Sequence, residues 1–508
     1  MATVTSRCSE LASSFCRDSG PHVEHFASSA VPAARCPRRP PNLDVTGITS
    51  GPAAAGSRLL PSSAACGAHA KGATEGEGHA GGASVLMQRG TAQRGENWLS
   101  SRLTNLAPWQ LFVCALLLRL VVIAMQPPPL ARLESVAAGL TLSHKGYLGD
   151  PFKIPTGVTA HVAPVYPLVV AVVDHFTHDE ARTVAVLRVF AALASALNVA
   201  LLIPVAAAMG LPPGAGAAAG LLWLVPLYSW IELSAQNETV LVVTAVLLLL
   251  GYAVNRMRQR AWSFGSGARL GLITGLAVHL SPLLLPMLGA SVAAGLAVER
   301  AAIRRSLPFI SGVLLLFMLA ILPYTLRNYV HFHSVFLIRD NFGLELAMSN
   351  GANAQATAKA NQAAGGTMRG HPFLSSTEAA RLRDTGEVQY NRIRMHDAVD
   401  WIATNPRAFA RLTIRRVGYM LLPPSERVYQ RLHALLVVLL FGAGLILLGN
   451  GACQLPIWML TASVAGYSAV LILLEQDIRY MYPALWIESL VAGALLVSRL
   501  SRSPTIAS

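Results

Sequence analysis

Residues 239–254 read TVLVVTAVLLLLGYAV, and the basic segment NRMRQR follows at once at residues 255–260. The first segment carries no charge and shows no alternation of apolar and polar residues. A helix needs roughly 20 apolar residues to cross a bilayer. Lipid offers no hydrogen-bonding partner to backbone N–H and C=O groups, so a spanning segment must pair them internally. The two segments therefore predict a membrane-spanning helix that ends at a cytoplasmic cluster of arginines.

The composition extends this prediction to most of the chain. Of 508 residues, 53% are hydrophobic and only 13% are charged, whereas a soluble domain typically carries about 25% charged residues. Residues 111–126, 184–209 and 307–324 are further apolar stretches with almost no interruption. The predicted fold class is an all-α polytopic membrane protein.

The net charge of +14 does not indicate a nucleic-acid partner. The cations lie mostly between the apolar runs, where the positive-inside bias and anionic lipid headgroups account for them. We therefore expect membrane lipids as partners, and no nucleic acid. Four of the six cysteines lie near the N-terminus without CxxC spacing, which favours neither a zinc site nor a disulfide framework.

The composition also divides the chain into regions. Residues 1–107 are rich in Ala, Gly, Ser and Pro without apolar periodicity, which predicts a disordered tail. Met87 leaves open whether residues 1–86 are translated. Residues 108–499 form the predicted transmembrane domain, and residues 500–508 a cytoplasmic C-terminal tail.

About ten spans fit the apolar runs when the short basic clusters are kept in the cytoplasm. The predicted spans are 109–126, 184–208, 213–232, 239–255, two short spans within 268–298, 307–326, 432–449, 456–474 and 482–499. Both termini are then cytoplasmic. Two long segments, 127–183 and 327–431, are predicted on the other side of the membrane.

Both long segments carry helix signals. In the first, Leu130, Leu133, Ala137 and Leu140 recur at helical spacing with Arg132, Glu134, Ser135 and Ser143 off that stripe, which predicts a helix lying in the membrane interface. In the second, Ser375-Ser-Thr-Glu378 predicts a capping box. Asn405-Pro406 predicts a helix cap followed by proline in the first turn.

Two charged residues are the first candidates for chemistry. Glu134 follows the first span, and a carboxylate there suits the removal of a proton from a hydroxyl; the alternative is that it only solvates its helix. Arg479 lies in a short loop between the last two spans, at the depth of lipid phosphates, which a guanidinium binds well. The alternative for Arg479 is a salt bridge with Glu475 or Asp477.

Other charges have weaker signals. Arg119 and Arg188 lie in or near spans, where Arg119 is expected to be structural or cavity-lining and Arg188 to snorkel. Glu232 and Glu238 flank a short turn and are candidates to line a cavity with Glu134. His331 and His333 with Asp340 fit a solvated surface better than a metal site. Only Glu475 with Asp477 is considered for a divalent ion, and the predicted site contains no metal.

Three stretches together resemble a known family. They are Gly146–Phe152 (GYLGDPF) with Thr159–Pro167 (TAHVAPVYP), Pro323–Asn328 (PYTLRN) with Asn341–Leu346 (NFGLEL), and Arg479-Tyr480 with Pro483. In this order they resemble the membrane-embedded GT-C glycosyltransferases, in particular bacterial relatives of protein mannosyltransferases and of the lipid A aminoarabinose transferase.

The resemblance implies a GT-C-like helical bundle with interfacial helices in the first outer loop, the second of them at 162–178. It implies that Glu134 is the catalytic carboxylate. It implies that the donor phosphate is bound by Arg479, Tyr480 and Lys145. The substrate cavity is expected to include Asp150, His161, Tyr166, Glu238, Arg327, Asn341 and Glu345, with no cofactor.

The implied activity is transfer of a sugar from a polyprenyl-phosphate donor to an acceptor glycan, lipid or protein. It would take place on the extracytoplasmic face of a bacterial inner membrane. The alternatives are a secondary transporter or lipid flippase, and a non-catalytic assembly partner. Transport predicts mid-membrane charges and an internal repeat, and the sequence shows no repeat.

Overall fold

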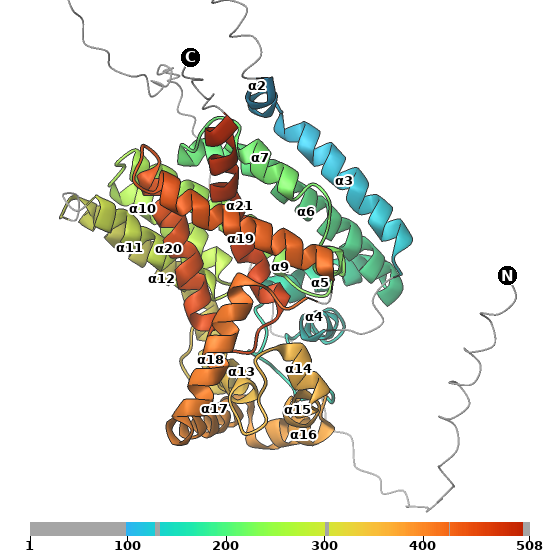
Figure 1. Cartoon of the computed structure of the whole chain (residues 1–508). Helices are drawn as coiled ribbons and strands as arrows, with labels where there is room; N and C mark the ends of the chain where they lie inside the picture. Colours follow the sequence, from blue (N-terminus) through green and yellow to red (C-terminus); the bar gives the residue numbers. More distant parts are fainter. Residues whose placement is uncertain (1–97, 128–132, 300–303, 426, 501–508) are drawn as a thin grey trace, which may run out of the picture. The chain divides into compact units, whose positions relative to one another are not determined.

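The computed structural model describes residues 98–127, 133–299, 304–425 and 427–500 (Figure 1). All named elements in these ranges are helices, which confirms the predicted all-α class. Most of the predicted disordered tail lies outside the described residues. Its last part, Trp98–Thr104, is instead the short helix α2.

Seven helices are long and apolar enough to cross a membrane, so the chain is a multi-pass membrane protein. Each coincides with one of the ten predicted spans. They are α3 (Pro108–Met125), α6 (Glu180–Met209), α9 (Thr239–Arg258), α12 (Leu307–Phe332), α19 (Val428–Leu448), α20 (Gln454–Leu471) and α21 (Ile478–Leu500).

The remaining three predicted spans form shorter helices. Residues 268–298 belong to α10 (Phe264–Ala277) and α11 (Leu284–Val298), two short helices as predicted. Residues 213–232 are not one span but α7 (Ala215–Leu222) and α8 (Ser229–Glu232). The Arg119 guanidinium donates hydrogen bonds to the carbonyls of Trp223 and Leu224, which lie between these two helices. This side chain satisfies backbone groups that an unbroken helix would satisfy internally.

Short helix α10 is held against α12 by close backbone contact. A Cβ added to Gly267 would lie 1.9 Å from the carbonyl oxygen of Phe309, and one added to Gly271 would lie 2.1 Å from that of Val313. The two glycines are four residues apart and therefore share one helix face. Small residues in this pattern let two membrane helices approach each other closely.

The two long connecting segments fold into helices that gather at one end of the bundle, which we call the loop end (Figure 1). The backbone N–H of Lys153 donates to Pro372 and that of Asp340 donates to Ala160, so the two segments are joined. The helices are α4 (Glu134–Lys145), α5 (Val165–Thr177), α13 (Phe342–Ser349), α14 (Ala358–Ala363), α15 (Gly366–Gly370), α16 (Ser376–Thr385), α17 (Glu387–Thr404) and α18 (Pro406–Leu421).

The predicted helix signals in these segments have different outcomes. The Ser375 side chain accepts the backbone N–H of Glu378, as the capping box predicts. Pro406 begins α18 as predicted, but the Asn405 side chain donates to the carbonyl of Trp401 instead of capping. Leu130 and Arg132 of the predicted interfacial stripe lie outside the described residues.

Helix α9 relates the loop end to the basic segment that follows it. At its start, Ser135 Oγ of α4 donates to Glu238 Oε2 over 3.4 Å. Its other end carries Arg256 and Arg258. A helix of 20 residues is about 30 Å long, the thickness of the hydrocarbon core. The basic segment and the loop end are therefore at opposite ends of the bundle.

Candidate functional site

Glu134 is the first residue of α4, and its carboxylate faces two histidines. The backbone N–H of Leu133 donates to the Gln236 side chain over 2.9 Å, which fixes the start of the helix. Glu134 Oε1 lies 3.3 Å from His161 Nε2 and 3.7 Å from His371 Nε2. The carboxylate is 26% exposed, so an incoming ligand can reach it.

His161 is buried, and a carboxylate from a distant helix positions its loop. The Glu387 carboxylate of α17 accepts hydrogen bonds from the Thr159 hydroxyl over 2.6 Å and from the backbone N–H of Ala160 over 2.7 Å. The His161 ring packs edge-on against Phe152, with 4.8 Å between the ring centroids. Sequence positions 159, 161 and 387 thus converge because the two loop segments are joined.

The charges of two guanidinium groups act on the same carboxylate. Arg339 Nε donates to the carbonyl of His161 over 2.7 Å, and the charge of Arg339 acts on Glu134. Arg479 donates its backbone N–H and its Nε to Asp477 Oδ1, over 2.8 and 3.2 Å. Arg479 also interacts electrostatically with Glu134. We call Glu134, His161, His371, Arg339 and Arg479 the Glu134 centre.

The terminal nitrogens of the two arginines are available for a ligand. Within the described part of the chain, the side-chain hydrogen bonds of Arg339 and Arg479 use Nε alone. Two parallel terminal N–H groups match the oxygens of a phosphate. The centre therefore combines an ionised carboxylate with two groups suited to an anion.

The electrostatics keep Glu134 ionised. Burial raises the pKa of its carboxyl, but the charge and hydrogen bond of His161 and the charges of His371 and Arg339 outweigh this and lower the pKa to about 2. For His161, burial lowers the pKa of the imidazole, yet the Glu134 carboxylate raises it above its usual value. Glu134 is therefore ionised at neutral pH, and His161 is shifted toward its charged form.

Two further carboxyl groups near the centre are shifted the other way. Burial raises the pKa of Asp340 to about 6 and that of Glu475 to about 7. The buried Asp340 Oδ2 has no hydrogen-bonded partner among the described residues, whereas Glu475 accepts the side-chain amide of Asn361. Carboxyl groups whose pKa values are shifted in opposite directions thus lie near one another.

Glu134, His161 and His371 could in principle hold a metal ion, because their ligand atoms all lie within 4.8 Å of one another. However, the backbone N–H of Phe373 donates to His371 Nδ1 over 3.1 Å. In a neutral ring this bond places the proton on Nε2, the atom that faces Glu134, and a metal would need the lone pair of that nitrogen. The hydrogen bond favours a contact of His371 Nε2–H with the Glu134 carboxylate over a metal site.

Several predicted site residues lie at or beside the Glu134 centre. Glu134, His161 and Arg479 belong to it, and the Arg479 guanidinium lies 5.7 Å from the ring centroid of Tyr480. Asn341 Nδ2 donates to Glu345 Oε1 over 3.2 Å, and the charge of Glu345 acts on both His161 and Tyr480. Glu238 bonds Ser135, the neighbour of Glu134.

Lys145 and Asp150 are not brought to this centre. Lys145 Nζ pairs with Asp150 Oδ2 over 2.8 Å. Lys145 ends α4, eleven residues after Glu134, a distance of about 16 Å along the axis. Asp150 Oδ1 accepts the backbone N–H groups of Thr156 and Gly157. The pair therefore closes a turn.

Tyr166 and Arg327 make other contacts in the described part of the chain. Tyr166 donates its hydroxyl to the carbonyl of Ala235 over 2.6 Å and is buried, which indicates a packing role. Arg327 lines a cavity of about 610 Å³ between α4, α5, α10 and α12. Its guanidinium lies 5.4 Å from the Tyr324 ring centroid.

Two expectations about charged residues in the bundle are wrong. Glu232 does not line the cavity, because it is fully buried with its Oε2 3.0 Å from Arg119 Nη2. Arg188 does not snorkel, because it is buried and donates to the carbonyls of Leu233 and Gln126. Arg119 and Arg188 each donate hydrogen bonds to backbone carbonyls at the ends of neighbouring helices inside the bundle.

Sequence reasoning gave no role to two members of the Glu134 centre, and one of them is His371. The other is Arg339. It stands two residues before the Asn341–Leu346 stretch, and this proximity is the only signal it gave. Its side chain also lines an apolar cavity of about 240 Å³, otherwise formed by Val278, Pro282, Leu285, Phe317, Ile321, Leu337 and Ile338. An apolar cavity thus ends at the charged centre.

No family model and no curated protein matches this chain. A solved structure, the oligosaccharyltransferase of Archaeoglobus fulgidus in its apo form, is similar with a TM-score of 0.44 and 14% sequence identity. The match covers 79% of this chain and 51% of the other, so this chain spans about half the length of the structure it matches. A likeness of this size assigns neither residues nor substrates to this chain.

Proposed function

We propose that this protein is a glycosyltransferase that moves one sugar from a polyprenyl-phosphate donor to an acceptor hydroxyl. The reaction takes place at the extracytoplasmic face of a bacterial inner membrane. The observation that carries this proposal is the Glu134 centre at one end of a membrane bundle, where the charges of two arginines act on a half-buried carboxylate. Among the described residues, the terminal nitrogens of both arginines make no hydrogen bond.

In the proposed reaction the acceptor oxygen attacks the anomeric carbon of the donor sugar. The bond between that carbon and the phosphate oxygen breaks, and its electron pair leaves with the polyprenyl phosphate. Arg479 and Arg339 stabilise the negative charge that develops on the phosphate. The acceptor proton passes to Glu134. Inversion at the anomeric carbon follows from this single displacement, and no metal takes part.

The low pKa of Glu134 is compatible with this role. A carboxyl group with a pKa of about 2 is a weak base toward an ordinary hydroxyl. The hydroxyl proton becomes strongly acidic as the oxygen bonds to the anomeric carbon, so a weak base is sufficient late in the reaction. Glu134 also needs no preceding deprotonation at neutral pH.

An isoprenoid donor is supported by the cavity that Arg339 lines. Seven of its eight lining residues are Val, Leu, Ile, Phe or Pro, and the eighth is Arg339. A ligand with an apolar chain and a phosphate head would place each part against matching groups. A soluble nucleotide donor would leave these apolar walls exposed to water.

The extracytoplasmic face is supported by the direction of α9. The Glu134 centre lies beside the start of this helix, and the basic segment lies at its other end. Short basic segments next to spans are usually cytoplasmic. The centre is then on the opposite side.

The test is a transfer assay with labelled polyprenyl-phosphate sugars and total membrane lipid and glycan acceptors. Glu134→Gln keeps the shape of the side chain but removes the base, so we expect transfer to fall about 100-fold or more. Glu299→Gln is the matched control, because Glu299 pairs with Arg260 of the basic segment, at the opposite end of the bundle from the Glu134 centre. It should keep most of the activity.

Full activity in Glu134→Gln, with an unchanged melting temperature, would refute the assignment. Carrier-dependent uptake or flipping without any transfer would instead support the transporter alternative.

A further inference from the structure

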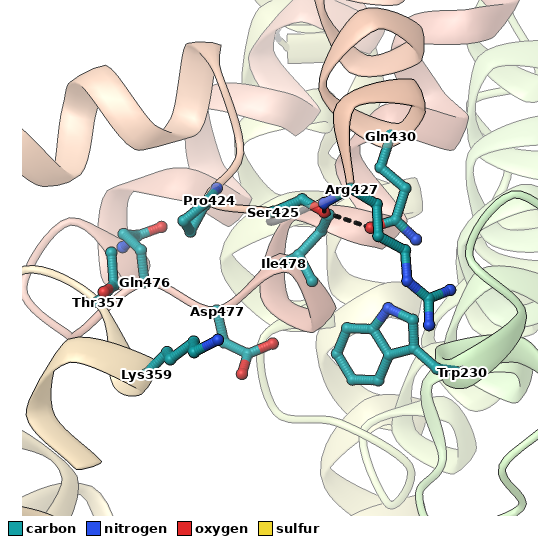
Figure 2. Close-up of a pocket in the computed structure, with 10 residues that line it drawn as sticks. All are labelled: Trp230, Thr357, Lys359, Pro424, Ser425, Arg427, Gln430, Gln476, Asp477 and Ile478. Atoms are coloured by element: carbon teal, nitrogen blue, oxygen red, sulfur yellow. Dashed lines mark hydrogen bonds between the residues drawn. The ribbon is translucent and has the colours of Figure 1, made fainter. Parts of the chain in front are cut away.

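A second cavity lies beside the Glu134 centre and has no role in the reaction described above. It has a volume of about 280 Å³ and is formed by residues of α8, of the start of α14, and of the segments that lead into α19 and α21 (Figure 2). Its lining residues are Trp230, Thr357, Lys359, Pro424, Ser425, Arg427, Gln430, Gln476, Asp477 and Ile478. We call it the Trp230 cavity.

The lining combines one broad aromatic surface with many hydrogen-bonding groups. Figure 2 shows Trp230 and Arg427 on one side of the cavity, and Thr357, Lys359 and Gln476 on the other, with Asp477 between them. Gln476 is 1% exposed, and its amide nitrogen donates to the carbonyl of Leu471. Its Oε1 has no hydrogen-bonded partner among the described residues, although buried oxygens normally have one.

This lining matches the chemistry of a sugar ring. A pyranose has an apolar face of C–H groups, which packs on an indole, and a rim of hydroxyls that both donate and accept. Carboxylate, amide and hydroxyl side chains around one aromatic ring meet both demands. The volume is just below the range of about 300–1,000 Å³ typical of drug-sized ligands, which suits one ring better than an extended chain.

One residue joins the Trp230 cavity to the Glu134 centre. Asp477 lines the cavity and accepts both N–H groups that hold Arg479 in place. Arg479 in turn interacts with Glu134. A sugar bound against Trp230 therefore lies next to the arginine that, in the proposed function, holds the donor phosphate.

We infer that the Trp230 cavity binds a sugar ring of the acceptor, so that the acceptor is a glycan or glycolipid. The assignment of the bound sugar to the acceptor rests on the proposed function. The binding of a sugar in this cavity does not. The cavity orients the acceptor, and a neighbouring hydroxyl of that acceptor reaches Glu134.

The test measures binding apart from transfer. The full chain in lipid nanodiscs is titrated with methyl α-glucoside, methyl α-mannoside, N-acetylglucosamine and glucuronate, and binding is followed by saturation-transfer NMR. We expect at least one of these sugars to bind to both the wild-type protein and Glu134→Gln. Trp230→Ala should weaken that binding about tenfold, since the stacking surface is lost. Trp230→Phe should restore most of it.

The matched control is Trp109→Ala, which removes an exposed tryptophan on α3 and should leave sugar binding unchanged. Binding of none of the sugars would overturn the inference. So would equal binding by Trp230→Ala and wild type, or binding of inorganic phosphate alone. If the sugars bind but no transfer is found in any assay, the proposed function fails while the sugar site stands. If transfer is found, Trp230→Ala should raise the acceptor KM and leave the donor KM unchanged.

Discussion

Two clusters in this protein each contain a glutamate and an arginine, but they differ in how many hydrogen bonds the arginine side chain makes. In the bundle, Arg119 and Glu232 are both fully buried and 3.0 Å apart. All three guanidinium nitrogens of Arg119 donate to oxygen atoms. In the Glu134 centre, Glu134 and Arg479 are 26% and 28% exposed. Among the described residues, the side chain of Arg479 bonds through Nε alone.

The difference separates a structural ion pair from a reactive one. A charge in lipid is tolerated when it has an opposite charge and hydrogen-bonding partners inside the protein. The Arg119 guanidinium has both, although Oε1 of Glu232 has no hydrogen-bonded partner among the described residues. A group that must bind a ligand has to keep some of its hydrogen-bonding capacity unused. Residue type does not distinguish the two cases, because glutamate and arginine are present in both.

The largest effect is expected from breaking the pair in the bundle. Arg119→Met leaves Glu232 as an uncompensated buried charge, which should cost about 3–5 kcal/mol of stability. Thermal unfolding in detergent or nanodiscs measures this loss. The double variant Arg119→Met with Glu232→Leu should regain much of it, because no unpaired charge remains. A single variant as stable as wild type would mean that the pair is not structural.

A smaller effect is expected at Arg479. Arg479→Gln removes a charged donor to the proposed phosphate, and such hydrogen bonds contribute about 1.5–3 kcal/mol. The donor KM should therefore rise roughly 10-fold to 100-fold, with little change in melting temperature. Arg411→Gln, at an exposed position of α18, serves as the control. An effect on stability as large as that of Arg119→Met would erase the contrast between the two clusters.

The smallest effect is expected at Glu475, which is intermediate between the two clusters. Its folded-state pKa of about 7 lies above the ordinary value of 4.5. The fold therefore favours the neutral carboxyl, and stability should fall as the pH rises from about 4.5 to about 7. Glu475→Gln removes this titration. The melting temperature of wild type minus that of the variant should be roughly 1–3 °C lower at pH 8 than at pH 5. An identical difference at both pH values would contradict the shifted pKa.

The sequence predicted the elements whose causes are local. Apolar runs such as 239–254 are helices because lipid forces the backbone to satisfy itself, and Ser375 caps its helix because the groups involved are three residues apart. The site was predicted in part. Glu134 and His161 lie 3.3 Å apart and the charge of Glu134 acts on Arg479, whereas Lys145 closes a turn with Asp150. Arg339 was missed because its contact with His161 joins residues that are distant in sequence.

By itself, the sequence determined that this chain is a bundle of membrane helices with two long segments between them. Only the tertiary structure decided which charges are saturated and which remain available. Length, hydropathy and caps are properties of neighbouring residues, and the chain reveals them directly. The partner of a buried charge comes from another helix, as Ser195 does for Arg119 across 76 positions, and no local pattern records it.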